Sequence, residues 1–229
     1  VPAVAGASTA DTGSATTTQA ATDTVAETPR VKIETPRLTG SISLVGGRID
    51  DLSLKDYRVD KSDGSDIVSM LSPVGSPSAY YALYGWAPGA GLSAEDVPGA
   101  NTEWRLETGA VLTPETPVTL YWDNGKGLNF RRTISIDADY MFTVEQSVEN
   151  TSSAAASMAP YGILARHGVG EDADLPGLKN FFILHEGFVG VANGTQQDAT
   201  YTDFDEPGTP PQTYPSTGRW VGITDKYWM

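Results

Sequence analysis

Hydrophobic and polar residues alternate along much of the chain after its first 30 residues, which is the pattern of half-buried β-strands. Three runs alternate in this way: LTGSISL (38–44), LNFRRTISI (128–136) and YMFTVEQSV (140–148). The turn signals Gly46-Gly47 and Asn124-Gly125 adjoin these runs. Because strict alternation marks a sheet with one buried face, the pattern predicts an antiparallel meander.

A sheet with one wetted face must pack against another layer, and the simplest partner here is a second sheet. Short strands predominate in the pattern, and helical periods are few. We therefore predict a mostly β fold, an antiparallel two-sheet sandwich over residues 31–215 that is larger than an immunoglobulin domain. Residues 73–101, which are rich in proline and glycine, are interpreted as a long loop.

Residues 1–30 differ in composition from the rest of the chain. They consist mainly of alanine, threonine, serine, glycine and aspartate, and they contain no aromatic side chain. Such a segment cannot bury enough apolar surface to offset the entropy cost of ordering it. We interpret it as a disordered linker that tethers the folded part.

The last stretch, STGRWVGITDKYWM (216–229), places its large apolar residues at helical spacing. Trp220, Ile223, Tyr227 and Trp228 fall at i, i+3, i+7 and i+8. This spacing predicts the start of an amphipathic helix, and tryptophan and tyrosine are enriched at membrane interfaces. A helix packed on the sandwich is the alternative. We expect Trp220 to pack against the β-domain and the final three residues to lack their normal neighbours.

The chain carries a formal net charge of −14, from 29 acidic and 15 basic side chains. Phosphate backbones are bound by clustered lysine and arginine, so this balance argues against nucleic acid as a partner. The absence of cysteine removes disulfides, thiol catalysis and cysteine-type zinc sites. No run in the sequence reaches the roughly 18–20 apolar residues that a membrane-spanning helix needs.

Two histidines, His167 and His185, are the candidates for acid–base or metal chemistry. Acidic residues follow them in the chain: Glu171, Asp172, Asp174 and Glu186. Their spacing matches no metal-ligand motif, and we interpret them as an acidic surface loop and a histidine at a strand edge. Three aspartate pairs are interpreted as turn residues that bond their own backbone: Asp50-Asp51, Asp137/Asp139 and Asp203/Asp205. We predict no catalytic, metal-binding or cofactor-binding residue.

Four aromatic residues cluster within the predicted long loop: Tyr80, Tyr81, Tyr84 and Trp86. Clustered aromatic side chains line grooves that bind sugars or peptides. They equally form a hydrophobic plug beneath a loop. Both alternatives stay open, and these four are the candidate cleft residues.

Three stretches together resemble the YidC family of bacterial inner-membrane protein insertases. TPRLTGSISLVGGRIDDLSLKDYR (35–58) matches an extended segment that ends in Gly-Gly and leads through a polar strand to a tyrosine. RRTISIDADYMFTVEQSVENTS (131–152) is similar to the family's strand–turn–strand that ends in an asparagine turn. The closing GRWVGITDKYWM (218–229) resembles the start of an amphipathic helix, with the inserted Arg219 as a departure.

The resemblance implies a periplasmic domain between the first two transmembrane helices of a multi-pass protein at the bacterial inner membrane. The fold it implies is a galactose-mutarotase-like super-sandwich with a short C-terminal helix. Residues 1–30 are then a linker from a membrane helix outside this sequence, and residues 216–229 begin the interfacial helix. The family inserts and folds inner-membrane proteins alone or with the Sec translocon.

The partners implied by the resemblance are SecDF, the Sec translocon and nascent membrane proteins, with SecDF contacts expected roughly within residues 150–205. The membrane is reached through segments outside this sequence. The family's polar insertion groove lies among its transmembrane helices, so no catalytic residue is carried over. The domain is expected to scaffold and dock partners.

Two alternatives follow from the residues and the implied fold. A carbohydrate-binding or mutarotase-like domain requires an acid and a base that face each other across a cleft, for example a histidine opposite a carboxylate. A binding cleft without chemistry requires exposed apolar area, which we expect near residues 80–86.

Overall fold

The computed structural model describes residues 28–167, 185–204, 213–215, 217–225 and 228–229, with the side chain of residue 202 left out. Within these residues the chain folds into 14 strands, a 3-10 turn η1 (Ala94–Asp96) and a short helix α2 (Tyr201–Phe204). The fold is mostly β, as the alternation predicts. Most of the predicted linker, residues 1–27, lies outside the described residues, and its last residue, Arg30, already begins the first strand.

Seven of the described strands form the largest sheet, in the order β11-β5-β3-β2-β1-β7 with β4 beside β3. Their bounds are β1 Arg30–Glu34, β2 Leu38–Ser43, β3 Arg48–Arg58, β4 Ile67–Leu71, β5 Tyr80–Pro88, β7 Val111–Leu112 and β11 Met158–Arg166. The described pairs are antiparallel except β1 with β7, which run parallel. Strand β5 lies inside the segment that was predicted to be a long loop, so that prediction is wrong for residues 80–88.

Four strands form the second sheet, in the order β10-β9-β8-β6. Their bounds are β6 Arg105–Thr108, β8 Val118–Asp123, β9 Leu128–Ile136 and β10 Phe142–Asn150. Strands β8, β9 and β10 are the predicted meander, with registers such as Val118↔Ile134 and Phe142↔Ile136. At the turn between β9 and β10, Asp137 Oδ1 accepts hydrogen bonds from the backbone N–H groups of residues 139, 140 and 141, as its turn interpretation requires.

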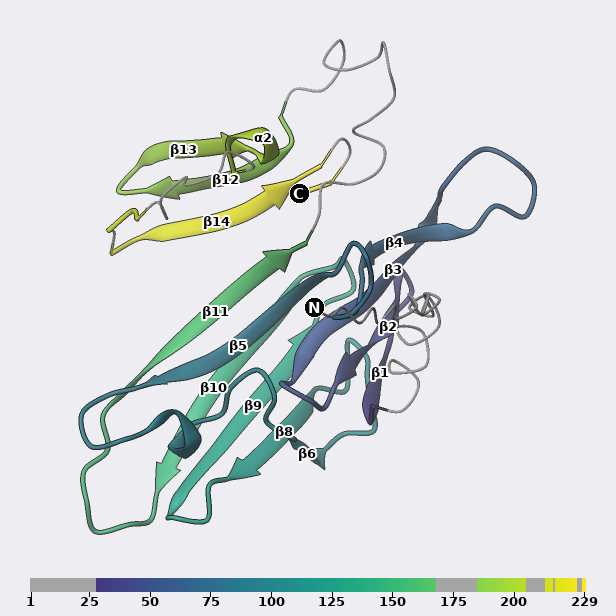
Figure 1. Ribbon diagram of the computed structural model, residues 1–229. Helices are drawn as coiled ribbons and strands as arrows, with labels where there is room; N and C mark the ends of the chain where they lie inside the picture. The colour runs from purple at the N-terminus through teal and green to yellow at the C-terminus, as the bar shows by residue number, and fades with distance from the viewer. Residues whose placement is uncertain (1–27, 168–184, 205–212, 216, 226–227) are drawn as a thin grey trace, which may run out of the picture.

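The core lies between these two sheets, which form the two layers of a sandwich (Figure 1). Every second residue of β9 is buried, while its neighbours are half-buried. The largest apolar side chains at the centre are fully buried: Ile33, Leu38, Ile42, Leu112, Leu120, Phe130 and Ile134. The predicted two-layer packing is therefore confirmed by the burial of alternate residues on facing strands.

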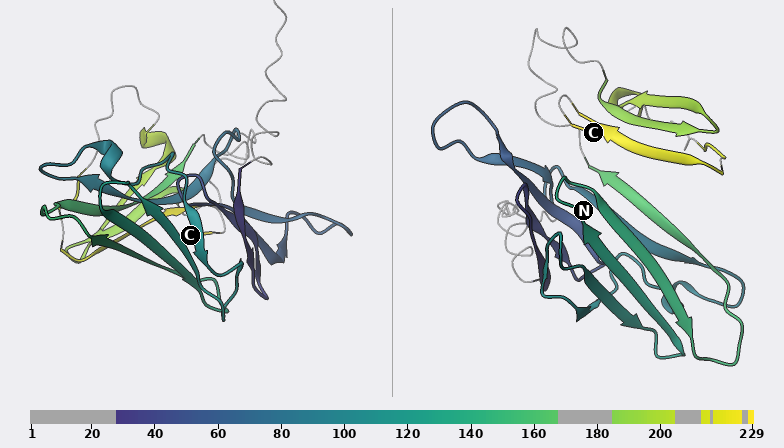
Figure 2. Two further views of the ribbon diagram at one scale, coloured as in Figure 1. Left: turned by 90° about the horizontal axis from the view of Figure 1, so that it is seen from below. Right: turned by 180° about the vertical axis from the view of Figure 1, so that it is seen from behind.

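A third sheet lies beyond one end of the sandwich, as Figure 1 and the right view of Figure 2 show. Within the described residues it has the order β13-β12-β14, with β12 Gly187–Ala192, β13 Thr195–Thr200 and β14 Arg219–Thr224. The prediction of two sheets is thus incomplete.

The predicted C-terminal helix is wrong for residues 219–224, which form β14. This strand pairs with β12 from Ala192↔Arg219 to Gly187↔Thr224, so a neighbouring strand satisfies its backbone. A short apolar run fits the helical and strand periods equally, and isolated short helices are unstable in water. Pairing with β12 therefore decides the conformation.

The contacts of the C-terminal aromatic residues also differ from expectation. Trp220 does not bury itself on the sandwich, because 49% of its surface is exposed. Trp228 does contact the sandwich: its ring meets Tyr57 of β3 edge-on at a centroid distance of 4.7 Å. Tyr227 lies outside the described residues. No helix in the described part of the chain is long and apolar enough to cross a membrane.

Candidate functional site

Strand β5 divides the four candidate cleft aromatics between its two faces. Alternation places Tyr80, Tyr84 and Trp86 on one face and Tyr81 on the other. Tyr84 and Trp86 pack against the core, and the Trp86 ring lies 6.2 Å from that of Phe130. The ring of Tyr81 stacks on that of His167 at 5.9 Å. The sequence cluster is therefore not one aromatic patch.

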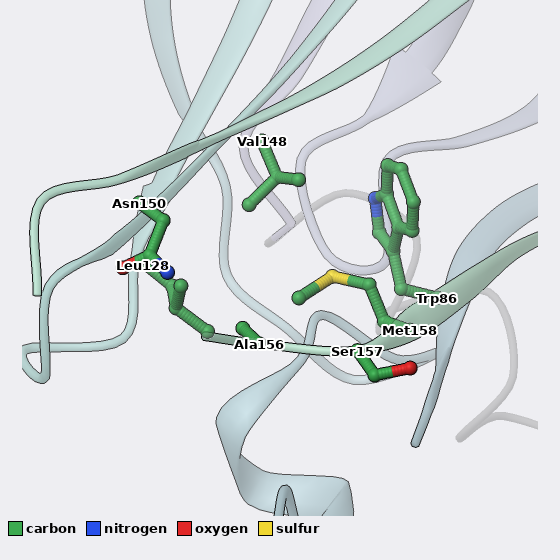
Figure 3. A pocket seen from close by; sticks show the side chains of 7 residues that line it. All are labelled: Trp86, Leu128, Val148, Asn150, Ala156, Ser157 and Met158. Carbon is green, nitrogen blue, oxygen red and sulfur yellow. The ribbon is translucent and has the colours of Figure 1, made fainter. Parts of the chain in front are cut away.

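Trp86 lines a groove between the two layers of the sandwich (Figure 3). The groove has a volume of about 360 Å³, and its lining residues are Trp86, Leu128, Val148, Asn150, Ala156, Ser157 and Met158. Trp86 and Met158 come from the seven-stranded sheet, and Leu128 and Val148 come from the four-stranded sheet. None of these lining side chains is ionisable, and the lining combines apolar side chains with the polar Asn150 and Ser157.

The wall of this groove at the β10–β11 connection is held by Asn150. Its Nδ2 donates to the carbonyl of Ala154 at 2.8 Å, and its Oδ1 accepts from the backbone N–H and the hydroxyl of Ser152. The amide is therefore engaged in shaping the loop. The indole N–H of Trp86 is buried and has no hydrogen-bond partner in the described residues.

A second groove, of about 580 Å³, lies where the end of β11 meets the third sheet. It is lined by Leu164, Ala165, Arg166, His167, Phe188, Tyr201, Phe204, Val221, Gly222 and Ile223. Most of these side chains are apolar, and no carboxylate of the described residues is among them. Exposed apolar area was expected near residues 80–86, but the exposed large apolar side chain in this groove lining from β11 is Leu164, which is 39% exposed.

Arg132 of β9 is a buried cation that the sequence reasoning did not identify as special. It is fully buried. Its Nη1 donates to the carbonyls of Gly46 and Gly47 at 3.1 and 3.0 Å, and its Nη2 donates to the carbonyl of Tyr84 at 2.5 Å. The guanidinium lies 4.6 Å from the ring of Trp104. Burial lowers its pKa to about 10, so it remains charged at neutral pH.

The alternating pattern could have identified Arg132 as a buried cation, because it is a charged residue at a position of LNFRRTISI whose side chain is predicted to point inward. Carbonyl groups rather than a carboxylate hold it: no ion pair of Arg132 is found within the described residues. Arg132 therefore ties the Gly46-Gly47 turn and β5 to the second sheet. Arg132 lines neither groove.

Among the described residues, neither groove places a histidine opposite a carboxylate; outside the grooves, the hydrogen bonds from Thr200 and then the charge of His185 lower the pKa of Asp203. His167 lines the second groove and stacks on Tyr81, and His185 Nδ1 lies 2.7 Å from Thr224 Oγ1. Glu171, Asp172 and Asp174 lie outside the described residues. Among the residues that the structure describes, no group of three or more histidine and acidic side chains is placed to hold a metal ion.

The aspartate pairs have mixed outcomes. Asp50 lies within β3, so its turn interpretation is wrong; it is buried and forms ion pairs with Arg30 and Arg48. Asp203 accepts from the backbone N–H and the hydroxyl of Thr200 at 2.7 and 2.8 Å, in keeping with a turn role. Asp205 lies outside the described residues.

The layered sheets and the opening between them define the chain as a β-sandwich domain with a groove between its layers. Residues 30–229 match the family described as the YidC periplasmic domain, and the chain belongs to this family.

Three relatives, each called membrane protein insertase YidC, illustrate the similarity. The protein of Ruegeria pomeroyi is 62% identical over 216 residues, which is 91% of this chain and 36% of the relative. The protein of Roseobacter denitrificans is 54% identical over 210 residues, 89% of this chain and 34% of the relative. That of Ruegeria sp. (strain TM1040) is 60% identical over 197 residues, 83% of this chain and 32% of the relative. The chain thus spans about a third of the length of these relatives.

Proposed function

We propose that this chain is the periplasmic docking domain of a membrane protein insertase that works alone or with the Sec translocon. In this proposal the domain scaffolds and contacts SecDF, the translocon and nascent membrane proteins, and it carries out no catalysis itself. Its place is the periplasmic face of the inner membrane. Membership of the YidC periplasmic domain family supports this role.

One observation carries the docking part of the proposal. The groove between the sheets presents Trp86, Met158 and Val148 without any ionisable side chain in its lining. Apolar surface at a concave opening favours contact with apolar segments of other polypeptides. Neither groove pairs a histidine with a carboxylate in its described lining, so no specific observation favours the sugar-active alternative.

The proposal is tested by site-specific photocrosslinking in the full-length insertase that carries this chain. A photoreactive phenylalanine analogue replaces Met158 in the groove, and a matched control replaces Thr143, which is exposed on the outer face of β10. We expect crosslinks to SecDF or to nascent membrane proteins from position 158 and not from position 143. Equal crosslinking from both positions, or none from position 158, contradicts docking at the groove.

A further inference from the structure

Among the described residues, strand β11 is an edge strand with one unpaired edge. It ends the seven-stranded sheet and pairs only with β5 among the described strands (Figure 1). Just beyond the two ends of this pair, Gly89 N–H donates to Ser157 O and His167 N–H donates to Ala79 O, each at 2.8 Å. Hydrogen-bonded residue pairs alternate along an antiparallel ladder. Odd-numbered residues of β11 therefore bond to β5, and the backbone N–H and C=O groups of its even-numbered residues face the open edge.

The side chains of these even-numbered residues face the second sheet. Met158 packs against the core and lines the first groove, whereas Leu164 and Arg166 line the second groove. Pro160 and Gly162 lie between them and are exposed. The even-numbered residues from Met158 to Arg166 thus form a strip along β11, about 26 Å long at roughly 3.3 Å per residue. The first groove lies at one end of this strip and the second at the other, where Ala165, His167 and residues of the third sheet also line it.

The strip is mostly apolar. In the first groove Val148 of β10 lies across from Met158, and the other half-buried side chains on that face of β10 are Phe142, Val144 and the polar Gln146. The one charged side chain among the even-numbered residues of β11, Arg166, forms an ion pair with Asp225. No described acidic side chain lines either groove, although the chain carries a net charge of −14. Charge complementarity therefore favours an uncharged occupant, because burying an unpaired charge is costly.

We propose that the open edge of β11 binds an extended, uncharged polypeptide segment of another protein as an added strand. Backbone groups of even-numbered β11 residues pair with the segment, and its alternate apolar side chains lie along the strip. Main-chain bonds then supply affinity and the two grooves supply side-chain preference, as in other cases of strand addition. This inference deepens the proposed docking function and rests on it.

Pro160 restricts where the added strand pairs. It occupies an even-numbered position, so the N–H that another residue would present to the open edge is missing. Proline on an edge strand limits uncontrolled strand pairing. Recognition therefore centres on residues 162–166, where the open-edge N–H groups are those of Gly162, Leu164 and Arg166.

The test measures fluorescence anisotropy of a labelled ten-residue peptide of alternating valine and threonine, titrated with the 229-residue chain. Leu164→Pro removes one open-edge N–H, and one net hydrogen bond of about 1 kcal/mol corresponds to a roughly fivefold loss of affinity. The matched control Leu164→Val keeps the N–H and only shortens the side chain, so it is expected to lose less affinity than Leu164→Pro. Pro160→Ala adds an N–H and is expected to tighten binding severalfold.

A second peptide keeps the test decisive even if Leu164→Pro does not fold. It carries N-methyl groups on the residues whose N–H groups face β11, so it retains its side chains and loses those backbone bonds. We expect it to bind the unaltered chain at least tenfold more weakly. Equal binding of both peptides overturns strand addition but leaves docking at the groove intact.

Two other results also overturn the inference. If neither peptide binds, β11 does not add such a segment; the crosslinking from position 158 then decides separately whether docking itself fails. If the chain sediments as a dimer that Leu164→Pro abolishes, the edge belongs to a second copy of this chain rather than to another protein.

Discussion

Arg166, the last residue of β11, forms an ion pair with Asp225, which directly follows β14. The rings of Tyr80 and Tyr201 flank the guanidinium at 5.2 and 5.3 Å. The hydroxyl of Tyr201 donates to Asp225 Oδ1 at 3.1 Å, and burial raises the pKa of Tyr201, so this hydroxyl stays protonated. Arg166 belongs to the sandwich, whereas Tyr201 and Asp225 lie beside strands of the third sheet. The cluster therefore joins the sandwich to the third sheet.

Arg166→Gln is expected to loosen the third sheet while the sandwich stays folded. The pair is only partly exposed, so its loss is expected to cost about 1–3 kcal/mol. Hydrogen exchange of the β12 and β14 amides checks this, and faster exchange there than in β9 is the expected result. The control Lys32→Gln removes an exposed partner of Glu34 in β1 and is expected to leave β12 and β14 unchanged. Unaltered exchange in Arg166→Gln contradicts the joining role.

Arg132→Met is expected to destabilise the sandwich by about 2–4 kcal/mol, because it leaves three buried carbonyl groups without their donor. These are the carbonyls of Gly46, Gly47 and Tyr84. Urea unfolding measures the loss. The control Arg105→Met removes an exposed arginine of β6 and is expected to change the free energy of unfolding by less than about 0.5 kcal/mol. A similar loss in both variants argues against the inter-sheet role of Arg132.

Gly47→Ala is expected to cost more stability than Gly125→Ala. Both glycines have positive φ, +61° and +71°, so alanine is strained in the left-handed region at either position. Only at residue 47 does the added Cβ clash with Arg132 Nη1, whereas at residue 125 it meets open space. The difference between their unfolding free energies isolates the clash. Equal losses contradict the close approach of Arg132 to this turn.

The free energy of unfolding is expected to decrease as the pH falls below about 4.5, and Glu34 is expected to account for part of this decrease. The hydrogen bond from Lys55, with Lys32 beside it, lowers the pKa of Glu34 from 4.5 to about 2. A carboxyl group with a lowered pKa in the folded state stabilises the fold above its unfolded pKa, and this contribution is lost as pH falls through the folded pKa.

Urea unfolding between pH 2 and pH 5 tests this expectation. Glu34→Gln is expected to flatten the pH dependence across that window. The control Glu145→Gln removes an exposed carboxylate of β10 and is expected to leave the slope unchanged. If the free energy of unfolding of Glu34→Gln changes with pH as steeply as that of the unaltered chain, Glu34 does not cause the pH dependence.

The second sheet was predictable because its information is local. In β9 and β10, side-chain alternation sets which face is buried, and Asp137 closes the turn between them through its own neighbours. Strand β5 was hidden for the opposite reason. Both of its faces carry apolar residues and its flanks are rich in proline and glycine, so no alternation distinguishes it from a loop.

The candidate groove likewise combines one residue that the local sequence identified with residues that it did not. Trp86 was identified from its aromatic neighbours, but Met158 and Val148, which meet it across the groove, come from strands more than 60 residues further along the chain. The pairing of β11 with β5 brings Met158 there. Neither spacing nor composition carries that information, since the register of distant strands depends on which faces pack together.

The sequence by itself determined the β class, the meander of β8 to β10 and the acidic character of the chain, because alternation, turn chemistry and charge are properties of neighbouring residues. Only the tertiary structure decided that residues 219–224 are a strand, that Arg132 is held by carbonyl groups, and that β11 pairs with β5. Each of these depends on a backbone group finding its partner from a distant part of the chain, and a buried backbone group must be paired.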